Sequence, residues 1–95
     1  MHCTNIRFSR HAIERMFERA IRPEDVRNVV AAGKSIAEYP DDTPYPSTLL
    51  LGFVDRTPVH VVVAKDAASG TCHIVTVYVP DETLWNDDFQ TRRQQ

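Results

Sequence analysis

The sequence predicts an α+β domain, in which two N-terminal helices pack on one face of a four-stranded, largely antiparallel sheet and a short C-terminal helix follows. Three observations predict this fold. Helical periodicity is confined to the first third of the chain, apolar segments separated by short turn sequences fill the middle, and a last apolar turn follows a proline. A chain of 95 residues has room for one domain, which we place at residues 6–90, with a polar tail at residues 91–95.

Two helices are predicted at the N-terminal end. The first begins after Ser9, a favourable N-cap residue. The apolar side chains that follow are spaced i, i+3, i+4 and i+7 and are expected to face the core: Ile13, Met16, Phe17 and Ala20. Pro23 suits the first turn of a second helix, which is expected to run to about Ala32 and to end at Gly33.

Strands are predicted for the rest of the chain. We expect a short edge strand over residues 35–39 and a loop over residues 40–47, because that loop contains three prolines. Three longer strands follow, separated by segments short enough for hairpins: residues 48–54, 59–65 and 71–79. Residues 83–89 are expected to form the final helical turn and to dock its apolar side chains on the domain.

The charge is distributed unevenly along the chain. The net charge of −2 argues against binding nucleic acid through bulk charge. Residues 1–34, however, carry seven basic and four acidic side chains, a balance of +3, whereas residues 35–95 carry four and nine, a balance of −5. We therefore expect any anion site to be local and to involve the first third of the chain.

Cysteine usage and hydropathy favour a cytoplasmic protein. Cys3 and Cys72 are far apart and belong to no CxxC module, so they are expected to be reduced thiols. The first twenty residues contain no continuous apolar stretch of signal-peptide length. The longest apolar runs, Leu49–Leu51 and Val61–Ala64, are far too short to span a membrane.

Imidazole and guanidinium side chains repeat every fourth residue along the first predicted helix: His11, Arg15 and Arg19. Residues four apart lie above one another on a helix, so these side chains are expected to form one row. Such a row suits a phosphate, because guanidinium groups donate in pairs and imidazole exchanges protons near neutral pH. The alternative interpretation is a solvated helix face, since Glu14 and Glu18 are interleaved with the row.

A second group of candidates comes from the alternation of side chains along the strands. His60 lies among the valines of an apolar strand and is expected to point away from the helices. If Val75 and the two later valines of the last strand face the helices, Thr76 and Tyr78 share the open sheet face with His60. The alternatives are a half-exposed structural histidine and, for Tyr78, an aromatic side chain that packs across strands.

These residue types suit metal-independent RNA cleavage by attack of the ribose 2′-OH. In this hypothesis the general base is His11 or His60, the acid is Tyr78 or the other histidine, and the phosphate is held by Arg15, Arg19 and Thr76. No cofactor is expected. The four histidines lack the spacing of a metal site, although a metal-dependent hydrolase is one alternative. The other is a non-catalytic protein-binding module that docks a partner on its open sheet face or its acidic C-terminal half.

Taken together, four segments resemble a family of small bacterial proteins known as domains of unknown function, number 4258: Ser9–Val26, Gly33–Ser47, Pro58–Ala64 and Thr76–Asp81. The resemblance implies kinship with RelE-like and BrnT-like toxin ribonucleases and a RelE-like fold. It also implies RNA as substrate and a YgiT-type zinc-finger antitoxin as partner. A homodimer is left open.

The family's His-x-x-x-Arg motif maps onto His11 and Arg15, its next arginine onto Arg19, and a strand histidine onto His60. Two positions depart from the family pattern. Ala20 stands where a glycine or a similarly small residue is usual, and Arg22 stands where serine or threonine is usual. The second departure removes a good N-cap residue from the following helix.

Overall fold

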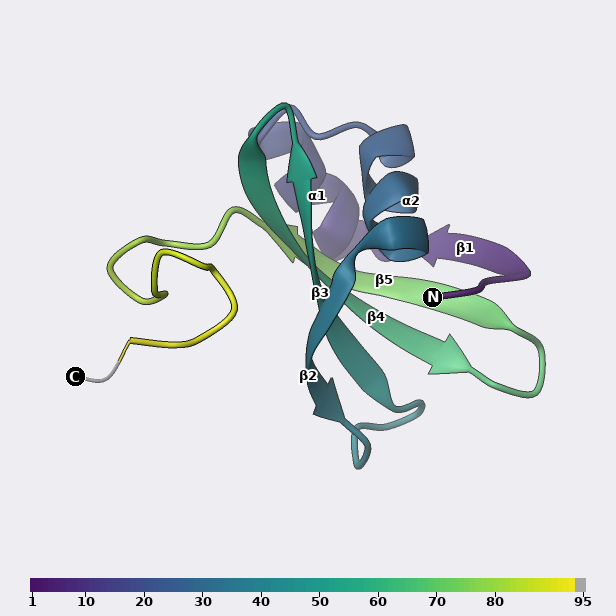
Figure 1. Cartoon of the computed structure of the whole chain (residues 1–95). Helices are drawn as coiled ribbons and strands as arrows, with labels where there is room; N and C mark the ends of the chain where they lie inside the picture. Colours follow the sequence, from purple (N-terminus) through teal and green to yellow (C-terminus); the bar gives the residue numbers. More distant parts are fainter. Residues whose placement is uncertain (94–95) are drawn as a thin grey trace.

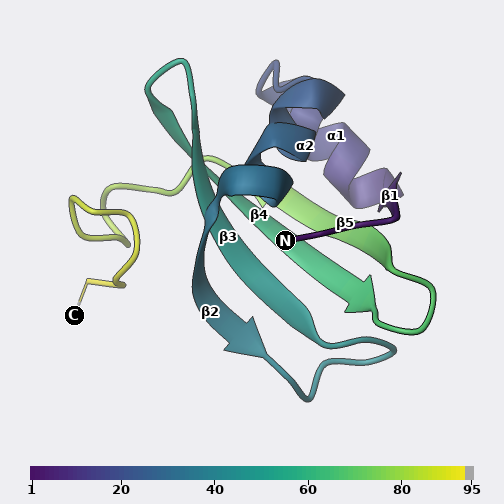
Figure 2. The same ribbon diagram turned by 45° about the vertical axis from the view of Figure 1, so that its right-hand side comes forward.

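The computed structural model describes residues 1–93 and contains a five-stranded sheet in the order β1-β5-β4-β3-β2, with both helices on one face (Figure 1). The elements follow one another as β1 (Asn5–Phe8), α1 (Arg10–Glu18), α2 (Pro23–Ala32), β2 (Lys34–Tyr39), β3 (Ser47–Val54), β4 (Thr57–Asp66) and β5 (Thr71–Tyr78). Figure 2 shows the helices on one side of the sheet and the segment after β5 on the other. The α+β class is therefore correct.

The prediction of four largely antiparallel strands was wrong because it omitted β1. This strand lies at the sheet edge and runs parallel to β5, with Ile6 opposite Cys72, whereas the other neighbouring strands are antiparallel. The sheet is therefore mixed. Half-buried Ile6 and Phe8 alternate with exposed Asn5 and Arg7, but four residues are too short a run to distinguish a strand from a loop.

The predicted C-terminal helix was also wrong, because the described residues after β5 form turns and one isolated β-bridge. Short acidic side chains explain the difference. The Asp81 carboxylate accepts from the backbone N–H of Thr83 at 2.8 Å, and the Asp88 carboxylate accepts from that of Gln90 at 2.9 Å. These local bonds compete with helical hydrogen bonds. The expected docking of Trp85 was confirmed, since this side chain is buried.

Both helices lie where the sequence predicts them. The Ser9 hydroxyl accepts from the Ala12 N–H at 3.0 Å and donates to the Val75 carbonyl at 2.9 Å, so the N-cap also ties α1 to β5. The chain leaves α1 through a left-handed turn at Ala20. Pro23 occupies the first turn of α2, as expected.

The core lies between the helices and one face of the sheet. Its fully buried strand residues alternate along β4 and are joined by residues of β3 and β5: Leu50, Val59, Val61, Val63, Cys72, Ile74 and Val77. The helices contribute Ala12, Met16, Val26, Val29 and Val30. This apolar face of β4 agrees with the strand pattern, which places His60 on the opposite face.

The sheet face away from the helices, called here the open face, carries three cross-strand rows that follow from the register. They are Leu51–His60–Tyr78, Leu49–Val62–Thr76 and Ser47–Ala64–His73. Thr76 and Tyr78 thus share a face with His60, as predicted. The expectation that Val75 faces the helices was wrong: a register shift in β5 leaves Val75 exposed on the open face, while Cys72 and Ile74 enter the core.

Cys3 and Cys72 form a disulfide, with a Cα–Cα distance of 5.7 Å, so the expectation of reduced thiols was wrong. The parallel pairing of β1 with β5 explains how residues 69 positions apart meet. Because β1 was not predicted, this proximity had no signal in the sequence. The disulfide fastens the N-terminal segment to β5, inside the core.

Candidate functional site

The predicted phosphate row lies on the outer surface of the helix layer. His11, Arg15 and Arg19 are all exposed on or at the end of α1. Arg15 Nη1 donates to Glu18 Oε2 at 3.0 Å, so one of the two arginines expected to hold the phosphate is already paired with a carboxylate. This pair is solvated and weak, and an incoming phosphate would be able to replace it.

His60 and Tyr78 meet on the open face. Tyr78 lies opposite His60 in the register, and its hydroxyl is 3.0 Å from His60 Nδ1. His60 Nε2 lies 2.7 Å from the Phe89 carbonyl oxygen. A carbonyl oxygen only accepts, so Nε2 carries the proton and Nδ1 accepts from the tyrosine hydroxyl. Both ring nitrogens of His60 are therefore occupied.

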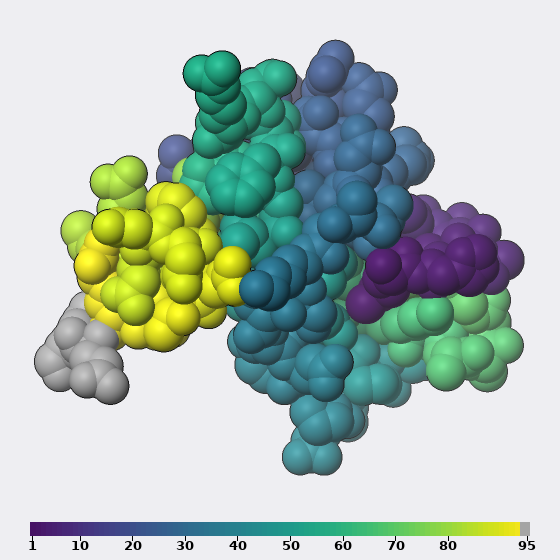
Figure 3. Space-filling model, in the orientation of Figure 1, coloured from purple at the N-terminus to yellow at the C-terminus, as the bar shows by residue number. Residues whose placement is uncertain are grey.

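The segment after β5 covers this pair. Trp85 packs edge-on against the His60 ring at a centroid distance of 4.5 Å, and His60 has no exposed surface. Figure 3 shows the segment as a yellow lobe beside the teal surface of the sheet. Burial lowers the pKa of His60 and raises the pKa of Tyr78, so both groups stay neutral near pH 7. His60 therefore anchors the C-terminal segment.

The structure does not bring the two predicted groups together. His11, Arg15 and Arg19 belong to the helix layer, whereas His60 and Tyr78 lie on the other face of the sheet. Thr76 is half-buried on the open face, opposite Val62. A single phosphate therefore cannot contact the arginine row and the His60–Tyr78 pair at once.

An apolar groove lies beside α1. It has a volume of about 310 Å³ and is lined by Phe8, Ile13, Met16, Phe17, Ile21 and Pro23. Phe17 is 88% exposed and Ile13 is 54% exposed, which is unusual for large apolar side chains of a small domain. Contiguous exposed apolar surface of this kind marks interaction sites.

The groove exists because α1 turns a different side to the sheet from the one predicted. The expected core stripe was Ile13, Met16, Phe17 and Ala20, but the buried residues of α1 are Ala12 and Met16. At 100° per residue, Ile13 and Phe17 point to the flank of α1 on one side of Met16. Arg15 and Arg19 are rotated from Met16 in the opposite direction around the helix axis. The arginine row therefore lies on the other flank of α1.

Arginines border the groove. The Arg27 guanidinium lies 5.5 Å from the centre of the Phe8 ring, on the groove lining, and it pairs with no carboxylate of residues 1–93. Arg22, between the lining residues Ile21 and Pro23, pairs with Glu24 and Asp25. The sequence pattern predicted the apolar stripe of α1, but it did not predict that Ile13 and Phe17 in this stripe are exposed.

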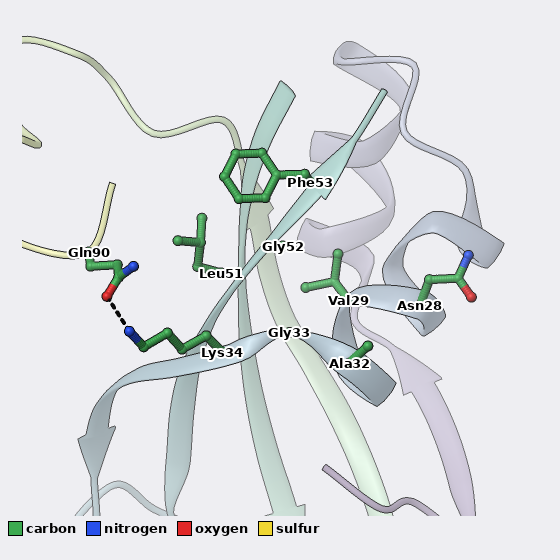
Figure 4. Close-up of a pocket in the computed structure, with 9 residues that line it drawn as sticks. All are labelled: Asn28, Val29, Ala32, Gly33, Lys34, Leu51, Gly52, Phe53 and Gln90. Atoms are coloured by element: carbon green, nitrogen blue, oxygen red, sulfur yellow. Dashed lines mark hydrogen bonds between the residues drawn. The ribbon is translucent and has the colours of Figure 1, made fainter. Parts of the chain in front are cut away.

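A second pocket, of about 410 Å³, lies between α2, β3 and the C-terminal segment (Figure 4). Two of its polar side chains pair with each other, because Lys34 Nζ donates to Gln90 Oε1 at 2.7 Å. Packing leaves no room for a side chain at Gly52, because a Cβ at this position would lie 2.6 Å from a Val29 methyl group. This pocket therefore lies where the C-terminal segment joins the domain, and its cationic side chain, Lys34, is already paired.

Comparison with known proteins gives a family without an assigned activity. Residues 8–79 match the family described as "Domain of unknown function (DUF4258)". The chain belongs to this family. No curated protein and no solved structure matches it.

The matched residues contain the groove, the arginine row and the His60–Tyr78 pair, whereas the segment that covers His60 follows them. In residues 1–93, no three His, Cys, Asp or Glu side chains gather closely enough to hold a metal ion. None of the described helices has the length and apolar composition needed to cross a membrane.

Proposed function

We propose that this domain binds a partner protein in the groove beside α1, and that the partner supplies an acidic, amphipathic helix. The observation that carries the proposal is the 88% exposure of Phe17 at the lip of a groove lined only by apolar side chains and proline. Exposing such a surface to water is unfavourable, and a partner that covers it gains that free energy.

The charged side chains at the edge of the groove indicate which kind of partner would bind there. Arg27 is unpaired among the described side chains, and the ion pair of Arg22 with Glu24 is exposed and weak. Carboxylates of a partner would contact these arginines around the edge of the groove, while its apolar side chains enter it.

The proposal is tested by titrating the chain with a synthetic helical peptide that has leucines at i, i+3, i+4 and i+7 and glutamates elsewhere. The control peptide has lysine in place of every glutamate. We expect the acidic peptide to bind at least about tenfold more tightly, a difference of about 1.4 kcal/mol. Phe17→Ala should weaken its binding by about tenfold or more, as expected for a central aromatic contact.

Two results would overturn the proposal. Equal affinity for the two peptides, unchanged by Phe17→Ala, would remove both the charge and the groove from recognition. Sedimentation of the free chain as a dimer that Phe17→Ala dissociates would identify the occupant as a second copy. Added salt should reduce the difference between the peptides, because it screens exposed charges.

Metal-independent RNA cleavage is a second candidate function, and one observation favours it. His60 and Tyr78 form an imidazole–phenol pair at 3.0 Å, and such pairs exchange protons in general acid–base catalysis. The Phe89 carbonyl occupies Nε2, so the C-terminal segment would have to move before RNA reached the pair. A YgiT-type antitoxin would then be the partner expected in the groove.

This candidate is tested by incubating the full chain with RNA in EDTA. Cleavage should leave cyclic phosphate ends, and Tyr78→Phe, which keeps the ring and removes the hydroxyl, should slow it by about 10²-fold or more. His11→Ala with Arg15→Ala tests the helix row separately. RNA that stays intact would contradict the candidate.

A further inference from the structure

A third cavity lies on the open face, far from the groove beside α1. It has a volume of about 430 Å³ and is enclosed by the loop before β3 and by β3, β4 and β5. Its floor is apolar and consists of Val62, Ala64 and Val75. Neither proposed function uses it, and a cavity with an apolar floor and a few polar groups is the usual form of a small-molecule site.

One wall of this cavity is aromatic. The Tyr45 ring and the His73 imidazole are nearly parallel, with an interplanar angle of 5° and a centroid distance of 5.3 Å. In the register, Ala64 separates His73 from Ser47. Because the two rings stack on each other, a planar ligand in the cavity is able to extend this stack on its free face, above the small Ala64 side chain.

Asp42 contributes a hydrogen-bond acceptor to the cavity lining. The buried Ser47 hydroxyl donates to Asp42 Oδ2 at 2.5 Å, which fixes the carboxylate at the cavity. Asp42 Oδ1 receives no hydrogen bond from residues 1–93. Neither lysine nor arginine lines the cavity, so a phosphate or carboxylate ligand is disfavoured next to Asp42.

We infer that this cavity binds a planar nitrogen heterocycle of the nucleobase type, stacked on the free face of the Tyr45–His73 ring pair, with its N–H donors directed at Asp42. Guanine fits best among the common bases, because its ring N–H and its amino group are adjacent donors that a carboxylate accepts in pairs. The inference is independent of the proposed binding in the groove beside α1, since it concerns the other face of the sheet.

The experiment is an NMR titration of the full chain with uncharged nucleosides, followed through the ring signals of His73 and Tyr45. We expect guanosine to shift these signals at the lowest concentration, and inosine, which lacks the amino group, to bind about tenfold more weakly. Adenosine, which lacks the ring N–H, should be weaker still.

Variants of the cavity residues test whether the nucleosides bind in this cavity. Asp42→Asn should abolish the preference for guanosine, and Tyr45→Ala should weaken all three nucleosides, whereas Tyr45→Phe should retain binding. Unchanged His73 and Tyr45 signals at millimolar guanosine would overturn the inference. So would guanosine binding that is unaffected by Asp42→Asn and Tyr45→Ala.

Discussion

Ala20 adopts a backbone conformation that favours glycine. Its φ angle is 54°, in the left-handed region, and the turn is closed by the Ile21 N–H, which donates to the Met16 carbonyl at 2.9 Å. An L-residue in this region costs about 1–2 kcal/mol, and glycine avoids most of that cost. We therefore expect Ala20→Gly to raise the free energy of unfolding by about 1 kcal/mol, as measured by urea denaturation.

Ala31→Gly is the matched control for this substitution. Ala31 is exposed and helical, so glycine there should lower the free energy of unfolding by about 0.5–1 kcal/mol. Replacing alanine by glycine should thus change the free energy of unfolding in opposite directions at the two positions. Destabilisation at both positions would mean that Ala20 is not in the left-handed region.

His60 links pH to the packing of the C-terminal segment. Burial lowers its pKa from 6.5 in the folded chain, so below pH 6.5 the unfolded chain takes up a proton that the folded chain resists. The contribution of His60 to stability is present above pH 6.5 and is lost as the pH falls towards the lowered value. Trp85, the only tryptophan, should therefore shift its emission to the red on acidification.

His60→Gln separates this effect from general acid unfolding. A glutamine amide is able to donate to the Phe89 carbonyl but does not titrate between pH 5 and 8. The variant should lose the acid-dependent change in Trp85 emission over that range, whatever its overall stability. An identical pH profile in the variant would exclude His60 as the responsible group.

At the scale of elements, the orientation of α1 is the feature with the largest consequence. Met16 is 4% exposed and Phe17 is 88% exposed, although the sequence pattern assigns both to one stripe. Met16→Ala should lower the free energy of unfolding by about 2–4 kcal/mol, because it opens a cavity in the core. Phe17→Ala should change it by less than about 0.5 kcal/mol. Thermal and urea unfolding of the two variants check this, and similar losses would place Phe17 in the core.

Hydrophobic periodicity predicted most of the helices and strands, but it did not predict how they pack against one another. The positions of Ser9 and Pro23 located both helices, and alternating apolar residues located β2 to β5. Which flank of α1 is buried depends on where β5 lies, and the register shift beside Val75 depends on β4, so neither is encoded locally. The alternation of side chains along the strands correctly placed Tyr78 on the same face as His60. It could not show that the Phe89 carbonyl, which is distant in the sequence, bonds to the histidine.

At the scale of the whole molecule, the disulfide joins the first residues to the last strand. It closes a loop of 69 residues, which in the chain-entropy account stabilises the fold by about 4 kcal/mol. Reduction with dithiothreitol should lower the free energy of unfolding by an amount of this order. Cys3→Ser should show the lower stability and no response to the reductant. Two free thiols in the folded, untreated chain would contradict this prediction.

The two proposed binding surfaces lie on opposite sides of the sheet. The groove beside α1 is apolar with arginines around it, and the open face holds an acidic cavity at one end and the covered His60–Tyr78 pair at the other. Because the core lies between them, occupation of one surface should leave the other accessible. Binding of the peptide and of guanosine should therefore be additive in free energy.

The most direct measurement is a chemical-shift map of the backbone amides during titration with the acidic amphipathic peptide. The proposal predicts that the shifts gather at Ile13, Phe17 and Ile21 and that Phe17→Ala removes them. Shifts confined to β4 and β5 on the open face, or none at millimolar peptide, would contradict the assignment of the groove as the binding site.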